Sequence, residues 1–166
     1  MRLLLIVSVV VAVCGSLSCS NKVTTSVVLL DEDIRLELVA SGGGSAGAPV
    51  TLRGLVRNAG AKPVEHHIVC GEPLIRIYSA TRSELYQIDP TQPVPCPLSI
   101  VPPLGPGETI EFSLTFDGNY FSATGDPLTA PPGAYSAIAT FKYRPPQGEG
   151  PSVIHGLTRE LSFSWQ

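Results

Sequence analysis

Four residues of the kinds that bind transition metals lie near the middle of the sequence: His66, His67, Cys70 and Cys96. Imidazole nitrogens and thiolates are common ligands of zinc and copper. The residues around the two histidines have the composition of a strand, in which neighbouring side chains point to opposite faces. His66 and His67 therefore cannot easily share one metal ion. We expect no metal site here and no cofactor elsewhere in the chain.

A serine hydrolase would need a nucleophile, a histidine base held against it, and donors for the oxyanion. The chain has many serines together with His155 and Asp126, but it has no Gly-x-Ser-x-Gly motif to present a nucleophile. Asp117 and Asn119 are spaced as in part of a calcium loop, yet too few oxygen ligands follow at the required spacing. The sequence therefore predicts a protein without catalytic residues that is not an enzyme.

Residues 1–20 have the anatomy of a bacterial export signal. A positive start at Met1-Arg2 precedes an apolar stretch from Leu3 to Val13, and the small residues of Gly15–Ser20 follow. The apolar stretch is too short to cross a bilayer comfortably. We therefore predict a signal peptide over residues 1–20 and export of the mature protein to the periplasm, the cell envelope or the extracellular space.

Two outcomes of this export are open. Cleavage after a small residue such as Ser18 or Ser20 would release a soluble protein. Alternatively, Ser16-Leu17-Ser18-Cys19 resembles a bacterial lipobox. Lipid attached to Cys19 would tether the protein to a membrane without a spanning segment. A lipid anchor is the only membrane contact that we expect.

The cysteines at positions 70 and 96 form an even pair once the leader is removed. The chain has four cysteines, of which Cys14 leaves with the signal peptide and Cys19 either leaves with it or is lipidated. In an oxidising compartment Cys70 and Cys96 are expected to form a disulfide. The loop-entropy model gives such a bond about 3 kcal/mol of stabilisation or slightly more. The alternative is a pair of buried free thiols.

The elements that would carry these residues are predicted to be strands. The sequence of 166 residues contains 16 glycines and 16 prolines, while 43% of the residues are hydrophobic and only 15% are charged. Strand-like runs separated by such turn residues favour an all-β fold with a sizeable core. The net charge of −3 and the absence of a basic stripe argue against nucleic acid as a partner.

We predict one domain, an antiparallel immunoglobulin-like β-sandwich of about 7–9 strands over residues 34–166. Residues 21–33 precede it as a linker with a lead-in strand. Two runs show most clearly the period of a strand with one buried face. The first places on that face Ile110, Phe112, Leu114 and Phe116, and the second places there Tyr135, Ala137, Ala139, Phe141 and Tyr143. Gly133 and Tyr135 predict a structural corner, in which the tyrosine hydroxyl reaches back to nearby backbone.

Other stretches are predicted to be less regular. Residues 41–48 are glycine-rich and are expected to form a flexible loop without core residues. Gly54 is expected to mark a bulge or a close approach of a neighbour. Residues 63–69 are predicted to form a strand. Residues 89–107 are rich in proline and should be extended and stiff, and residues 116–132 should form a long connection.

Three turn and strand-start motifs resemble those of a known family. They are Leu55-Val-Arg-Asn-Ala-Gly60, Leu104-Gly-Pro-Gly-Glu108 and Pro131-Pro-Gly-Ala-Tyr135. In this order they resemble the BsuPI-like family, described as bacterial intracellular proteinase inhibitors, from Ile34 to Tyr143. The resemblance implies an antiparallel β-sandwich and proteinase inhibition, but it transfers no inhibitory residue to a position of this chain.

A substrate-like inhibitor needs an exposed, extended segment that is already rigid, so that little entropy is lost on binding. The segment Pro93–Ser99 has this character because prolines stiffen it and Cys96 would hold it. Pro97, Leu98 and Ser99 are therefore candidate contacts with a protease, and residues 126–129 are a second candidate. Alternatively, the prolines only end strand pairing at a sheet edge.

The predicted function is an exported, non-enzymatic binding module for a protein partner, with proteinase inhibition implied by the family resemblance. The alternative is a structural lipoprotein or accessory domain of the cell envelope, which binds protein or polysaccharide and inhibits no protease. The sequence leaves the oligomeric state open.

Overall fold

The computed structural model of the chain describes residues 24–27, 33–67, 71–94, 102–144 and 154–166. These residues form strands, turns and bends without a helix, and all the strand pairs among them are antiparallel. The predicted all-β fold with antiparallel sheets is confirmed. This part of the chain accordingly contains no helix long and apolar enough to cross a membrane. The predicted signal peptide lies outside the described residues.

The first sheet has four strands in the order β1-β2-β3-β7. Their bounds are Thr24–Val27 for β1, Ile34–Ser45 for β2, Ala48–Asn58 for β3 and Thr109–Phe116 for β7. Strands β2 and β3 form a long hairpin. Strand β7 pairs with β3 from Thr109, opposite Arg57, to Phe116, opposite Val50. This sheet therefore carries the end of β7 to one end of the molecule.

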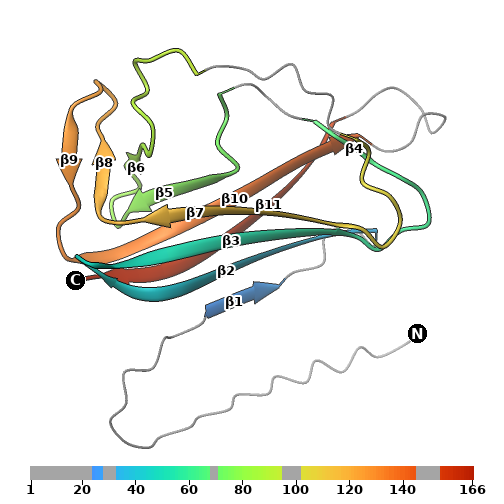
Figure 1. Ribbon diagram of the computed structural model, residues 1–166, viewed down its shortest axis with the longest axis horizontal. Coiled ribbons are helices and arrows are strands. Elements are labelled where there is room, and N and C mark those ends of the chain that lie inside the picture. Colours follow the sequence, from blue (N-terminus) through green and yellow to red (C-terminus); the bar gives the residue numbers. More distant parts are fainter. Residues whose placement is uncertain (1–23, 28–32, 68–70, 95–101, 145–153) are drawn as a thin grey trace, which may run out of the picture.

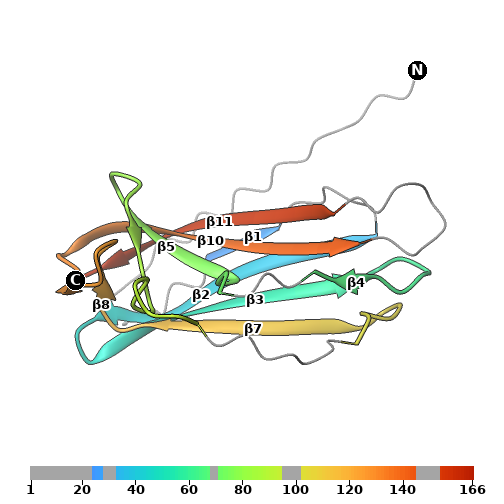
Figure 2. The same ribbon diagram turned by 90° about the horizontal axis from the view of Figure 1, so that it is seen from above.

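The second sheet has the order β11-β10-β5-β6, and β4 pairs with the end of β10. The bounds are Glu65–His66 for β4, Ile75–Ser79 for β5, Glu84–Leu85 for β6, Gly133–Arg144 for β10 and His155–Trp165 for β11. Figure 1 shows β10 and β11 running side by side along the length of the molecule. In Figure 2 the strands β10 and β11 lie on one side, and β3 and β7 lie on the other.

A third, two-stranded sheet stands at the end of the molecule where β7 finishes. It consists of β8, Asn119–Phe121, and β9, Pro127–Thr129. Figure 1 shows this hairpin upright beside β6. Two hydrogen bonds between the backbones of Tyr86 and Phe121, at 2.8 and 3.3 Å, join it to the segment that follows β6.

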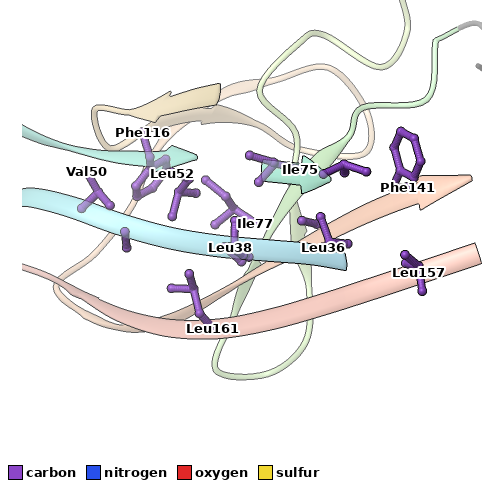
Figure 3. Close-up of a cluster of buried hydrophobic side chains, with 14 of the residues drawn as sticks. Leu36, Leu38, Val50, Leu52, Ile75, Ile77, Phe116, Phe141, Leu157 and Leu161 are labelled. Carbon is purple, nitrogen blue, oxygen red and sulfur yellow. The ribbon is translucent and has the colours of Figure 1, made fainter. Parts of the chain in front are cut away.

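The core lies between the two large sheets and is built from the alternate residues of their facing strands. The alternation predicted for β10 is confirmed, because Tyr135, Ala137, Ala139, Phe141 and Tyr143 are all buried. Figure 3 shows side chains from both sheets gathered in this layer, including Leu38 of β2, Ile77 of β5 and Leu161 of β11. Burial of such side chains contributes about 25 cal/mol for each Å² of apolar surface removed from water.

One buried cation also links the two sheets. Arg159 lies among the inward-facing residues of β11 and is buried. Its Nε donates a hydrogen bond of 3.1 Å to the carbonyl of Leu36 in the other sheet, and its Nη1 donates one of 2.7 Å to the carbonyl of Thr158. These bonds offset part of the cost of removing the guanidinium from water.

The glycine-rich run at residues 41–48 is not the loop that its composition predicted. Strand β2 continues to Ser45 and β3 begins at Ala48, with a register shift between Gly42 and Ser45. Gly44 is buried there. A side chain at this position would overlap the carbonyl of Ser164 in β11, so the close approach of the two strands requires glycine. Its carbonyl accepts a hydrogen bond of 2.7 Å from the amide of Gln166. The glycines thus permit close packing instead of flexibility.

Strand lengths and strand number also differ from expectation. The eleven described strands exceed the expected number because β4, β6, β8 and β9 contain only two or three residues each. Residues 116–132, expected to be a connection, contain the β8–β9 hairpin. The strand predicted over residues 63–69 is limited to Glu65–His66 among the described residues.

The apolar face predicted for β7 is only partly buried. Phe116 is fully buried, whereas Ile110, Phe112 and Leu114 are half-buried and pack against the core. The ring of Phe112 lies where a side chain on Gly54 would be, so Gly54 is a site of close approach, as the sequence predicted.

A buried amide at the end of β3 ties three segments together. Asn58 is 0% exposed, and its Nδ2 donates to the carbonyls of Lys62 and Leu104 at 2.8 and 2.9 Å. Its Oδ1 accepts from the amide of Gly60 at 2.9 Å. Its backbone bonds to Gly107 and Glu108 at 2.7 and 3.0 Å. The turn after β3 and the approach to β7 are therefore held by one side chain.

Replacing Asn58 by alanine is expected to cost about 2–4 kcal/mol of unfolding free energy, because a fully buried side chain and its three hydrogen bonds are lost. Urea denaturation of the purified protein measures this loss. The matched control is Asn119→Ala, at an exposed asparagine, which should cost less than about 1 kcal/mol. Equal losses in the two variants would contradict the role of the buried amide.

Candidate functional site

A cleft of about 440 Å³ opens at the end of the sandwich where β7 gives way to the β8–β9 hairpin. We call it the end cleft. Its lining residues come from the segment after β6, the end of β7 and both strands of the hairpin. They are Gln87, Thr115, Asp117, Asn119, Tyr120, Phe121, Pro127, Leu128 and Thr129. The cleft therefore combines carboxylate, amide and hydroxyl groups with aromatic and aliphatic surface.

A tight turn after β7 holds the only carboxylate of this lining. The backbone amide of Asn119 donates a hydrogen bond of 2.9 Å to Oδ1 of Asp117, and its Nδ2 donates one of 3.2 Å to Oδ2. The backbone bond, followed by the side-chain bond, lowers the pKa of Asp117 below its usual value. The carboxylate is thus charged at neutral pH and fixed in orientation.

The turn rests on the indole ring of Trp165, which is buried at the end of β11. Gly118 has a φ of 91°, and a side chain there would overlap the Trp165 ring. Only glycine adopts this conformation without strain and leaves room for the indole. Trp165 in turn packs edge-on against Phe116, with ring centroids 5.1 Å apart. The floor of the turn is therefore part of the core.

The hairpin wall of the end cleft is held at both of its ends. At the base, the amide of Ala130 donates to the carbonyl of Gly118 at 2.7 Å. At the tip, Oγ1 of Thr124 donates to Asp126 at 2.6 Å, and Gly125 packs against Asp89 and Thr91 of the loop opposite. The hairpin wall is therefore held by bonds within the chain.

A smaller hollow of about 80 Å³ lies at the other end of β10. His66 and His67 line it together with Glu72 and Lys142, and His66 stacks on Phe141 with ring centroids 4.4 Å apart. Burial, followed by the nearby His67, lowers the pKa of His66. The described residues include no group of three or more histidine, cysteine, aspartate or glutamate side chains able to hold a metal ion.

A charge network covers this second hollow. Nζ of Lys142 lies 2.6 Å from Glu72, whose pKa is lowered chiefly by this hydrogen bond. Arg76 lies 3.2 Å from the same carboxylate and 3.8 Å from Glu84. These charged side chains form ion pairs with one another on the outer face of the second sheet, so we assign no ligand to the second hollow.

Six of the residues singled out from the sequence lie outside the described part of the chain. This applies to Cys19, to the expected disulfide partners Cys70 and Cys96, and to the candidate protease contacts at positions 97–99. These assignments stay predictions.

The corner residues Gly133 and Tyr135 begin β10. The hydroxyl of Tyr135 donates a hydrogen bond of 2.6 Å to the carbonyl of Pro131. Its ring packs on Phe116 and Phe163, both at a centroid distance of 5.9 Å. The corner thus fixes the chain between the end-cleft hairpin and the second sheet.

No model of a known protein family matches the sequence, and a comparison with curated proteins finds no match either. The resemblance to BsuPI-like inhibitors therefore stays a prediction drawn from turn and strand-start motifs. The function has to be argued from the geometry of the chain itself.

Sequence reasoning identified single members of the end cleft but not the site. Asp117 and Asn119 were weighed as calcium ligands, and residues 126–129 as a second protease-contact loop. The local signals for this site were the Asp117-Gly-Asn119 turn and the short hairpin sequence that follows it. Gln87 joins them only through the backbone bonds between Tyr86 and Phe121, which no local pattern predicts.

A Gly118→Ala variant should lose stability for two reasons, a strained φ and a clash with Trp165. Gly107→Ala is the matched control, because Gly107 has a φ of 78° but nothing within 4 Å of the added carbon. We expect the control to cost about 1 kcal/mol, and Gly118→Ala to cost at least about 1 kcal/mol more. Unfolding free energies from urea denaturation test this difference, and equal losses would exclude a contribution from the indole.

Proposed function

We propose that this protein is an exported, non-enzymatic binding module with an immunoglobulin-like β-sandwich, and that its ligand binds in the end cleft. The observation that carries the proposal is a polar cleft whose walls are held by hydrogen bonds within the chain. Binding then orders few side chains, so little entropy is lost. Export is supported by the signal-like residues 1–20, with the soluble and lipidated forms both open.

The position of the cleft agrees with how β-sandwiches bind ligands. Loops at one end of a sandwich are joined to a rigid scaffold, and such loops commonly carry binding residues. The Tyr135 hydroxyl bond to the carbonyl of Pro131 is also typical of the corner found in immunoglobulin-like domains. A cleft of about 440 Å³ lies within the usual size of ligand sites, about 300–1,000 Å³.

Blocking the cleft tests the proposal. In Thr129→Trp a bulky ring would occupy the end cleft, whereas in Thr109→Trp the same ring lies at the far, exposed end of β7. Isotope-labelled protein is titrated with bacterial cell-envelope proteins solubilised in detergent and, separately, with lipid-free envelope polysaccharide. We expect one fraction to shift the amide signals of Asp117, Asn119 and Thr129 in the wild type and in Thr109→Trp, but not in the blocked variant.

Two results would overturn the proposal. The first is the absence of shifts at the end cleft with both envelope fractions. The second is an identical response of Thr129→Trp and Thr109→Trp, because binding would then not need the cleft. Folding of each variant is checked from the dispersion of its amide spectrum.

A second candidate function is proteinase inhibition, which the BsuPI-like resemblance implies. One contact supports it: a side-chain carbon on Gly71 would lie 3.7 Å from Cβ of Val94. In the sequence, Gly71 follows Cys70 and Val94 stands two residues before Cys96, and both cysteines lie outside the described residues. We propose a disulfide between Cys70 and Cys96 as the bond that would hold the proline-rich segment rigid.

Purified oxidised protein tested against a panel of serine proteases decides this second candidate. We expect inhibition that is lost after reduction and weakened by Leu98→Arg. The control is Ile154→Arg, at an exposed isoleucine just before β11. No inhibition at large molar excess would rule out the inhibitor, and equal weakening by both substitutions would remove residues 97–99 from consideration.

A further inference from the structure

The hydrogen-bonding groups of the end cleft are balanced between donors and acceptors. The Asp117 carboxylate accepts two bonds from Asn119 and has further lone pairs free. Gln87 donates one bond of 3.2 Å to the carbonyl of Leu85, which leaves its oxygen and a second N–H. Thr115 and Thr129 add hydroxyl groups. A ligand that both donates and accepts at neighbouring atoms matches such a lining.

Apolar surface lies within the same cleft. Leu128 is 43% exposed, so part of its apolar surface is accessible to a ligand. Its strand partner across the hairpin is Tyr120, and Phe121 lies opposite Pro127. The ligand should therefore have apolar faces as well as hydroxyl or amide edges.

The charge of the lining restricts the ligand further. The lining residues include one carboxylate and no lysine, arginine or histidine. Because hydrogen bonds from Asn119 keep the pKa of Asp117 low, the carboxylate repels phosphate, sulfate and uronate groups.

We infer that the end cleft binds a neutral oligosaccharide, an inference that rests on the proposed binding function. Vicinal hydroxyls of a sugar ring both donate and accept, so they can pair with Asp117, Asn119 and Gln87. The C–H face of the ring can pack on Tyr120, Phe121 or Leu128. The cleft is open to solvent on one side, so a chain of sugars can extend beyond it.

The test uses neutral oligosaccharides of defined structure. Full-length mature protein is titrated with maltohexaose, cellohexaose, xylohexaose, mannohexaose and chitohexaose, and binding is followed by amide shifts and calorimetry. We expect at least one of them to bind saturably at the end cleft. Asp117→Ala should weaken that binding about tenfold or more, the effect of losing a hydrogen bond to a charged group.

Glu108→Ala is the matched control. Glu108 is also a carboxylate that organises a turn next to β7, through a bond from the amide of Gly105, but it does not line the cleft. Its substitution should leave the affinity unchanged. If Asp117→Ala folds poorly, Leu128→Ala serves instead, since it removes exposed apolar surface and should weaken binding several-fold.

Salt separates a neutral ligand from an ionic one. Affinity for the oligosaccharide should not change between about 0.05 and 0.5 M NaCl, whereas binding of a cationic peptide by Asp117 would weaken steeply.

Failure of all five oligosaccharides would overturn the inference, as would equal affinities of Asp117→Ala and the wild type. If envelope proteins still shift the cleft signals, the binding module stands and only its ligand class is wrong. If neither the envelope proteins nor the envelope polysaccharide shift the amide signals of the end cleft, the binding function and the oligosaccharide inference are both wrong.

Discussion

The frame of the molecule depends on one buried amide. Asn58 bonds through its side chain to the segments at Gly60, Lys62 and Leu104, and through its backbone to the turn before β7. These bonds decide where the chain leaves the first sheet and where it returns as β7. The pairing of β7 with β3 is continuous from there to Phe116. The register set at Asn58 therefore fixes how far along the molecule Thr115 and Asp117 stand.

Much of the fold could be predicted, because apolar residues at every second position indicate a strand and show which of its faces is buried. That rule identified the buried face of β10 and, together with the turn residues, the all-β class. Composition misled at Gly44, which the sequence placed in a flexible loop. A glycine is needed there because the carbonyl of Ser164, in a strand distant in sequence, lies where a side chain would be. The two-residue period also overestimated the burial of Ile110 and Leu114, because their strand lies at the edge of its sheet within the described residues.

The candidate site was less predictable, because its parts come from segments that only tertiary pairing brings together. Asp117 and Asn119 are neighbours in sequence, and their turn can be read locally. Gln87 reaches the cleft through a backbone bridge, and Trp165 supports it from a strand formed much later in the chain. Polar residues at turns are usually only solvated. Their shared cleft becomes evident once the hairpin is seen to be clamped at its base and its tip.

The support that Trp165 gives to Gly118 affects the order of events during synthesis. Gly118 and the hairpin leave the ribosome well before the indole that they rest on, since chains grow from the N-terminus. Until residue 165 emerges, β10 also lacks the strand with which it pairs over its full length. A nascent chain therefore cannot display a finished cleft early. Molecules interrupted before Trp165 would lack the indole on which the Gly118 turn rests, so they could not form the floor of the end cleft.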